Sequence, residues 1–267
     1  MKKKLAAIAA IGLLCALATG CGGGSDDSSS GQPPAPALNP QGFWSGTTSD
    51  GATINLIVLE TGETYGYYAS NSHMSSGIID GAVFGDMAFS NTQLSGSWLD
   101  FNFYTQIVKS YSHTGNFAPQ NSLTLRFPSG VAYTATYGSG YDQPQAPLST
   151  VAGNYSSGMG AIGRMNFAST ASLPVSASAV VSASGAITLS PIRGCSANGT
   201  IQPRASGKNI YDVVLNLQGS GCMLLDSAAL RGIAMYAPGS GTSVGGALLI
   251  EARDAAKTGG LFFLAGK

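Results

Sequence analysis

The chain contains few residues that could carry out acid–base or metal chemistry. Its 267 residues include only two histidines, His73 and His113, which we interpret as surface or half-buried side chains. The acids Glu60 and Glu63 flank a turn, and solvation of that turn explains them. Three further acids could converge inside a β-barrel as a glycosidase pair must, although their spacing does not require it: Asp80, Asp86 and Asp100. The sequence therefore indicates no catalytic set, no cofactor and no metal site.

Two glycine motifs match strings known from enzymes but lack the required context. Residues 158–163 fit G-x-G-x-x-G, yet a dinucleotide site needs a preceding strand, a following helix and a later acid. Because Arg164–Ser169 is strand-like, we interpret these glycines as a flexible hairpin. Residues 241–245 fit G-x-S-x-G. No histidine follows Ser243, and Ala247–Ala252 is strand-like, so a nucleophile elbow is not expected.

Tyrosine is the enriched residue type with binding potential. Tyr65, Tyr67 and Tyr68 lie in a glycine-containing strand-like stretch, with Asn71 nearby. Tyr together with Asn and Ser can form a recognition surface at low entropic cost. These four residues are the candidate binding residues, and the alternative is that they are aromatics of a core or barrel wall.

The N-terminus has the features of a secretory signal. Lys2–Lys4 precede the uncharged stretch Leu5–Ala18, which would span about 21 Å as a helix and is too short for a membrane span. The following Leu17-Ala18-Thr19-Gly20-Cys21 resembles the bacterial lipobox, with its Leu one place earlier than in the commonest pattern. The resemblance implies removal of residues 1–20 and lipidation of Cys21, including palmitate. An ordinary signal peptide, which would leave a free thiol, is the alternative.

The region after Cys21 predicts a disordered tether. Residues 21–41 are rich in Gly, Ser, Asp and Pro and have almost no apolar side chains to bury. Twenty such residues reach about 25 Å root-mean-square. By analogy with lipoprotein sorting, Gly22 in place of Asp implies the outer membrane, with the facing side left open. The partners expected are thus the membrane, through the lipid, and a protein or glycan.

The remaining cysteines agree with export. Cys15 leaves with the signal, so Cys195 and Cys222 form an even pair, which predicts a disulfide in an oxidising compartment. The chain-entropy model assigns this loop about 3.5 kcal/mol. Two free buried thiols are the alternative. A metal site is disfavoured because no Cys-x-x-Cys occurs and no histidine follows His113.

Composition excludes several classes of protein. Only 10% of residues are charged and 44% are hydrophobic. Without Lys2–Lys4 the mature chain has 10 basic and 13 acidic residues, so its formal charge is 10 − 13 = −3. A generic nucleic-acid binder needs a basic face, so no nucleic-acid partner is expected. Scarce Glu and Lys also disfavour coiled coils.

The body of the chain predicts an all-β fold. Short apolar runs alternate with glycine-containing turn signals every 8 to 12 residues. In 122–127 and 210–218 apolar and polar side chains alternate, as expected for strands with one buried face. We expect two small antiparallel barrels, or lipocalin-like meanders, in tandem. Only Asp254–Lys257 and Asp226–Leu230 have the pattern of a short helical turn.

The domain boundaries follow from a proline-containing linker. We expect a first β domain at 42–141, a linker at 142–150 that contains Asp142, and a second β domain at 151–267. A faint repeat supports this division, since Gly42-Phe43-Trp44-Ser45 and Gly153-Asn154-Tyr155-Ser156 occupy matching places at the two starts.

The second half resembles uncharacterised bacterial lipoproteins with a tethered two-domain β body. The segments that carry this resemblance are Gly194-Cys195, Asn198–Ile201, Lys208–Val213, Cys222 and Arg231–Ala234. The general plan also resembles the β-barrel surface lipoproteins of the factor H-binding and transferrin-binding types. That likeness is of architecture only, and no binding motif of those families transfers to particular residues.

Together these features predict a non-enzymatic outer-membrane lipoprotein that binds a macromolecule or serves as an envelope component. A lipocalin-like carrier of small ligands is an alternative and predicts an apolar cavity inside a barrel. An inhibitor of host or competitor hydrolases is another, and it would need a protruding loop.

Overall fold

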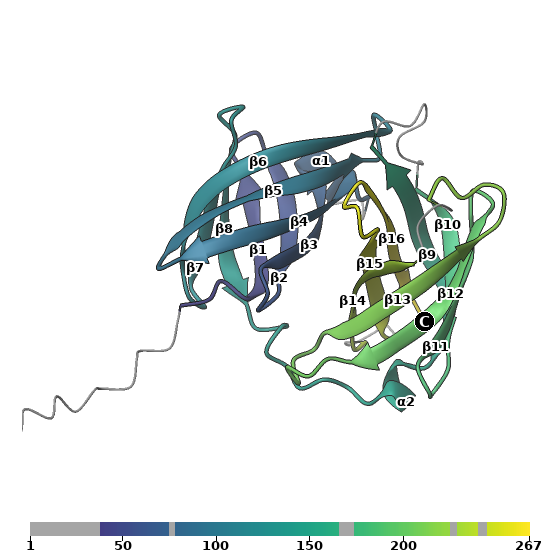
Figure 1. Cartoon of the computed structure of the whole chain (residues 1–267). Coiled ribbons are helices and arrows are strands. Elements are labelled where there is room, and N and C mark those ends of the chain that lie inside the picture. The colour runs from purple at the N-terminus through teal and green to yellow at the C-terminus, as the bar shows by residue number, and fades with distance from the viewer. Residues whose placement is uncertain (1–37, 75–77, 166–173, 225–228, 240–244) are drawn as a thin grey trace, which may run out of the picture. The chain divides into compact units, whose positions relative to one another are not determined.

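The computed structural model of the chain describes residues 38–74, 78–165, 174–224, 229–239 and 245–267. Its sixteen strands form two closed antiparallel barrels, β1–β8 and β9–β16 (Figure 1). The predicted all-β class with two barrels in tandem is confirmed. The predicted domain boundaries at 42–141 and 151–267 stay predictions.

The first barrel is an up-and-down meander. Each strand pairs with its neighbours in sequence, and pairing between β1 and β8 closes the ring. Its strands are β1 (Gly42–Thr48), β2 (Ala52–Val58), β3 (Glu63–Ser70), β4 (Gly81–Ser90), β5 (Gln93–Asn102), β6 (Ile107–Ala118), β7 (Ser122–Arg126) and β8 (Ala132–Gly138).

The second barrel repeats this plan, and pairing between β9 and β16 closes it. Its strands are β9 (Gly153–Arg164), β10 (Val175–Val181), β11 (Ala186–Ile192), β12 (Cys195–Pro203), β13 (Tyr211–Gln218), β14 (Leu230–Ala237), β15 (Ala247–Arg253) and β16 (Gly259–Gly266). The predicted hairpin at 158–163 is wrong, because these residues lie within β9. A Cβ on Gly158 would lie 2.2 Å from that of Ala265 on β16, so glycine here permits close strand contact.

Alternation of side chains fills each barrel, as the strand pattern predicts. On β7, Leu123 and Leu125 point inward and are fully buried. On β13, Tyr211, Val213 and Leu215 do the same in the second barrel. Each barrel interior is therefore a separate hydrophobic core.

The short helices lie at positions other than the predicted ones. The described residues contain two one-turn helices, α1 (Asn71–Met74) and α2 (Leu148–Val151). The segment Asp254–Lys257 is instead a hydrogen-bonded turn, because the Asp254 carboxylate accepts the Thr258 N–H at 2.7 Å and holds the chain there. Of Asp226–Leu230, only the end lies in the described residues. Among the described helices, none has the length and apolar character to cross a membrane.

A third hydrophobic cluster joins the outer walls of the two barrels. It includes Tyr65, Phe84 and Phe101 from the first barrel and Leu249 and Phe262 from the second, all nearly inaccessible to solvent. These side chains occupy the alternate positions that point away from their own barrel's core. Burial of large apolar side chains from both barrels stabilises the contact between them.

Ion pairs surround this cluster. Arg253 on β15 makes a bidentate contact with Asp86 on β4, with N–O distances of 2.7 and 3.0 Å. Burial opposes ionisation of Asp86, but hydrogen bonds from Arg253 and Lys257 hold the pKa of its carboxyl below the usual value. On another side, Arg204 contacts Glu60 at 2.7 Å. These ion pairs therefore fix the alignment of the two barrels where they contact each other.

One buried carboxyl lies within the contact. Glu251 on β15 is inaccessible to solvent, and its Oε2 accepts the Gly66 N–H at 2.9 Å. Its Oε1 has no hydrogen-bond partner among the described residues. Burial raises the pKa of Glu251 to about 8. The side chain is therefore mostly protonated at neutral pH, which avoids placing an unpaired charge in an apolar contact.

The predicted linker packs against the second barrel. The Tyr211 hydroxyl donates to the Ala146 carbonyl, and Val151 of α2 is fully buried in the core of that barrel. Asp142 pairs with Lys208 at 2.6 Å. The proline-containing segment is thus anchored at several points.

Candidate ligand site at the mouth of the first barrel

A cavity opens at one end of the first barrel, where β2, β4, β6 and β8 begin. Its volume is about 330 Å³, at the lower end of the range for ligand pockets. Most of its lining is apolar or aromatic, with a few polar groups among them. The lining residues are Thr48, Asp50, Ala52, Ile54, Tyr68, Val83, Trp98, Asp100, Asn102, Tyr111, Phe127, Ser129 and Val131.

Alternation along β5 places the most informative of these side chains. Trp98, Asp100 and Asn102 occupy every second position and face the interior, whereas Leu99 and Phe101 face the second barrel. The five residues 98–102 thus supply both the wall of the cavity and the contact between barrels. A period of two is sufficient to explain this division.

Glycines across the sheet make room for the large rings of the site. Tyr68 pairs with Gly81, and Trp98 pairs with Gly85. A Cβ on either glycine would lie 2.4 Å from the facing ring, closer than atoms can approach. The two rings therefore occupy space that a side chain at either glycine would fill.

Asp100 is the polar centre of the cavity. Its Oδ1 accepts a 2.8 Å hydrogen bond from the Tyr68 hydroxyl. Burial raises the pKa of Asp100 to about 6, against the opposing effects of the Tyr68 hydrogen bond and of Lys109. Lys109 lies across from Asp100 in the β5–β6 register, but the described residues include no ion pair to Asp100 within 4.0 Å. The carboxylate is thus only partly compensated.

Unpartnered polar atoms lie beneath the cavity. Neither nitrogen of His113 has a hydrogen-bond partner among the described residues, and the same holds for Trp98 Nε1. The His113 ring lies 5.0 Å from Trp98 and 6.0 Å from Phe127 between ring centroids. Burial lowers the pKa of His113 to about 4, so the ring is neutral at neutral pH.

The prediction for His113 is therefore wrong, because this residue is 2% exposed. It lies on the inward face of β6, where Gly96 across the sheet leaves room for the ring. His73 is partly exposed and bonds Asp80 through Nδ1 at 2.5 Å. This pair holds α1 beside the barrel mouth. Burial alone would raise the pKa of the Asp80 carboxyl, but hydrogen bonds from Ser70 and His73 outweigh that effect and lower it.

Exposed apolar side chains gather around this mouth. Among the described residues, six large hydrophobic side chains are exposed, and four of them belong to this end of the first barrel. Those four are Ile78, Tyr104, Ile107 and Tyr111, with Tyr104 78% exposed. A second hollow, lined partly by Tyr104, His73 and Asp80, shares Tyr68 and Asn102 with the main cavity. The rim is thus apolar on the side of β4–β6, whereas Asp50 and Ser129 line the cavity at the turns of the opposite side.

The candidate tyrosines separate by face. Tyr68 lines the cavity, whereas Tyr65 is 2% exposed in the cluster between the barrels. Tyr67 packs against that cluster, 6.2 Å from the Phe262 ring. The side chain of Asn71 and the whole of Cys21 lie outside the described residues. Sequence reasoning missed Trp98, Asp100 and Asn102 as a set, although their alternate spacing was visible.

The predicted acids are not brought together. Asp80 bonds His73, Asp86 bonds Arg253 and Asp100 bonds Tyr68. Within the part of the chain that the structure describes, no group of three or more His, Cys, Asp or Glu side chains is arranged to hold a metal ion. Residues 241–244 of the G-x-S-x-G string lie outside that part.

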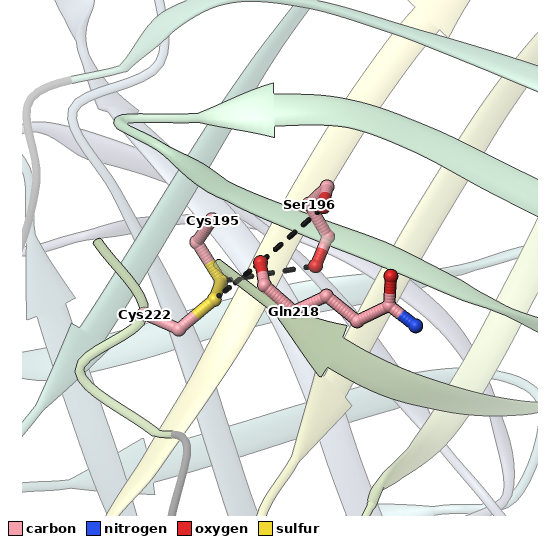
Figure 2. The surroundings of a disulfide bond; sticks show 4 residues. All are labelled: Cys195, Ser196, Gln218 and Cys222. Carbon is pink, nitrogen blue, oxygen red and sulfur yellow. Dashed lines mark hydrogen bonds between the residues drawn. A yellow bond between two sulfur atoms is a disulfide. The ribbon is translucent and has the colours of Figure 1, made fainter. Parts of the chain in front are cut away.

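The disulfide expected from the sequence is present between Cys195 and Cys222, with a Cα–Cα distance of 4.5 Å. Cys195 begins β12, and Cys222 follows β13, so the bridge extends this strand pair beyond its last paired residues, Ser196 and Gln218. Figure 2 shows both sulfurs beside the carbonyls of those two residues. The Cys222 sulfur lies 3.0 Å from the Gln218 oxygen. The bridge is buried in the core of the second barrel.

No family model matches the chain, and no curated protein matches it. Among solved structures, it is similar to a double mutant of the vaccine antigen Transferrin Binding Protein B from Haemophilus parasuis Hp5. The sequence identity is 8%, the match covers 86% of this chain and 76% of that chain, and the TM-score is 0.28. A likeness at this level carries no argument about function.

Proposed function

We propose that this protein is a non-enzymatic lipoprotein of the outer membrane that binds a protein partner through the mouth of its first barrel. The supporting observation is the group of exposed apolar side chains on one side of the cavity mouth. Exposed apolar patches with embedded aromatics are typical of protein interaction sites. In this proposal the second barrel is a scaffold that holds the first one.

The membrane anchor in this proposal rests on the sequence alone. The lipobox-like residues 17–21 would place a lipid on Cys21, and the 21–41 tether would let the barrels stand off the membrane. Replacement Cys21→Ser should therefore move the protein from the membrane fraction to the soluble fraction of the envelope. Retention of the Cys21→Ser variant in the membrane fraction would contradict the proposed anchor.

Site-specific photo-crosslinking in intact cells tests the binding surface. A photoreactive phenylalanine analogue at Tyr104, on the rim, should give a discrete protein adduct. The same analogue at Val180, which is 54% exposed on the second barrel, is the matched control and should give none. Combining the Tyr104 probe with Ile78→Ser and Ile107→Ser should abolish the adduct. Equal adducts from both positions, or none from Tyr104, would reject the proposed surface.

A carrier of small ligands is the second candidate, because the cavity volume of about 330 Å³ lies in the range for small molecules. The rim distinguishes the two functions. A carrier would keep its ligand when Ile78 and Ile107 become serine, whereas a protein receptor would lose its partner.

A further inference from the structure

The charge of the cavity lining has one sign. Its two ionisable carboxyl groups belong to Asp50 and Asp100, and no lysine or arginine lines it. Of the Asp100 oxygens, only Oδ1 has a hydrogen bond among the described residues. A partly buried carboxylate with an open oxygen is destabilised until a cation or further donors reach it. The lining therefore favours a cationic group.

Aromatic rings line the space beside this carboxylate. Trp98 forms part of the wall with Phe127, at 5.2 Å between ring centroids, and Tyr111 stands across from Trp98 in the β5–β6 register. The faces of such rings attract ammonium and guanidinium groups, most strongly where water is excluded. Carboxylate and rings together select a cation over a neutral hydroxylated ligand, which would leave the charge of Asp100 unpaired.

The apolar part of the cavity suits the stem of a long basic side chain. Ile54, Val83 and Val131 line the same space as Asp100. Lysine and arginine bury methylene stems against such residues while their charged ends reach a polar partner. The exposed rim side chains Tyr104 and Ile107 offer contact area for the surface that carries the basic side chain, which a free amine would not use.

We propose that the mouth of the first barrel receives a single basic side chain, lysine or arginine, from a partner protein, and that its charge pairs with Asp100. This inference rests on the proposed function and adds the chemistry of the contact. The partner's side chain would pass between the rim residues and lie against Trp98.

Calorimetric titration of the full mature chain with short peptides tests this contact. The probes are Gly/Ser pentapeptides with a central arginine, lysine or citrulline, the last being the neutral counterpart of arginine. We expect the arginine or lysine peptide to bind at least tenfold more tightly than the citrulline peptide. Asp100→Asn should remove that preference. Asp212→Asn is the control, because this carboxylate pairs with Arg204 and lies outside the cavity lining; it should change the affinity less than twofold.

A second variant keeps the test independent of any folding defect in Asp100→Asn. Ser129 lies exposed at the cavity edge, and Ser129→Arg should supply an internal cation that competes with the peptide. Ser129→Gln should leave peptide binding unchanged. Equal affinity for arginine and citrulline peptides, or unchanged binding by Asp100→Asn, would overturn the inference.

Two further probes, choline and N-acetylglucosamine, distinguish a basic protein side chain from a small cation and from a neutral sugar. Binding of choline without binding of either basic peptide would overturn the assignment to a protein side chain. Binding of N-acetylglucosamine alone would overturn the inference that the cavity binds a cationic group. Failure here leaves the proposed function intact if the Tyr104 crosslink persists in Asp100→Asn. Absence of the Tyr104 crosslink would instead reject the proposed function.

Discussion

The two barrels share one topology but fill their interiors differently. The core of the second barrel consists of aliphatic residues, alanines, three tyrosines and Phe263 around a disulfide. The interior of the first contains both tryptophans of the chain, together with His113, Tyr68 and Asp100. Beside the cavity of the first barrel, the Tyr68 and Trp98 rings lie over Gly81 and Gly85. In the proposed function, the first barrel makes the contact with the partner and the second supports it.

The largest effect expected from this contrast concerns the disulfide. Replacing Cys195 and Cys222 together by serine should lower the free energy of unfolding by about 3.5 kcal/mol, because the unfolded chain regains the entropy of a 27-residue separation. Urea unfolding monitored by circular dichroism measures this change. Both tryptophans, Trp44 and Trp98, lie in the first barrel, so their fluorescence reports that barrel alone.

The shared apolar cluster makes a further prediction for this double variant. Because Phe84 and Phe101 pack with Phe262 across the contact, tryptophan fluorescence and circular dichroism should shift to lower urea together. A fluorescence transition that stays at the wild-type midpoint would show that the barrels unfold separately, and it would sharpen the division of roles.

Next in size is the effect of a glycine beneath a ring. In Gly85→Ala the new Cβ would lie 2.4 Å from both the Trp98 ring and the Ser97 carbonyl oxygen, so the first barrel should lose about 2 kcal/mol of stability through overpacking. Gly266→Ala in the second barrel is the matched control, since a Cβ there meets nothing within 4 Å. Thermal melts of the two variants that coincide would contradict the role of Gly85.

A smaller effect of opposite sign is expected at Asp100. Burial raises its pKa from 3.8 to about 6, so folding takes up protons between these values and the carboxylate costs stability above pH 6. The shift corresponds to at most about 3 kcal/mol above pH 6, and Asn loses the charge-assisted hydrogen bond from Tyr68. Asp100→Asn should therefore be more stable than the wild type by about 1 kcal/mol at pH 7.5. The advantage should shrink as the pH falls toward 4.

The groups facing Asp100 do not reverse this prediction. Tyr68 and Tyr111 stay neutral throughout this range because burial raises the pKa of each hydroxyl. Thermal melts of the wild type and the variant across pH 4 to 8 give the measurement. A variant that is less stable at pH 7.5 would mean that Asp100 supports the fold, and the contrast between the barrels would weaken.

The smallest effect on stability belongs to the rim. Tyr104→Ser should change the free energy of unfolding by less than about 0.5 kcal/mol, because the side chain is 78% exposed. Partner binding should nevertheless fall. A large loss of stability, measured by the same urea titration, would assign Tyr104 to folding and remove it from the proposed contact.

The sequence predicts the barrels well because the relevant signals are local. Leu123, Leu125 and their polar neighbours fix which face of β7 is buried, and glycine-containing turns separate the strands. The pairing of Cys195 with Cys222 follows from the cysteine count once export is inferred. These features need no knowledge of distant contacts.

The site was less predictable because it depends on curvature and on the second barrel. Tyr65 and Tyr68 lie in one strand, yet Tyr65 packs against the other barrel and Tyr68 faces the cavity. A period of two assigns them to opposite faces but does not say which face is open. The buried state of His113 likewise depends on Gly96 across the sheet, a pairing that becomes visible only when the register is known.

The seam of each barrel has a consequence for the order of folding. Apart from the two closing pairs, β1–β8 and β9–β16, all paired strands are neighbours along the chain, so their hairpins can form early. The closing contacts, such as Trp44 with Tyr137 and Gly160 with Phe263, form only when the last strand of each barrel is present. Synthesis begins at the N-terminus, so the first ring can close long before β16 emerges. Until the second barrel has formed, Phe84 and Phe101 on the outside of the first barrel stay exposed to solvent. Because exposed apolar surface promotes aggregation, the incompletely synthesised chain is then most dependent on a chaperone.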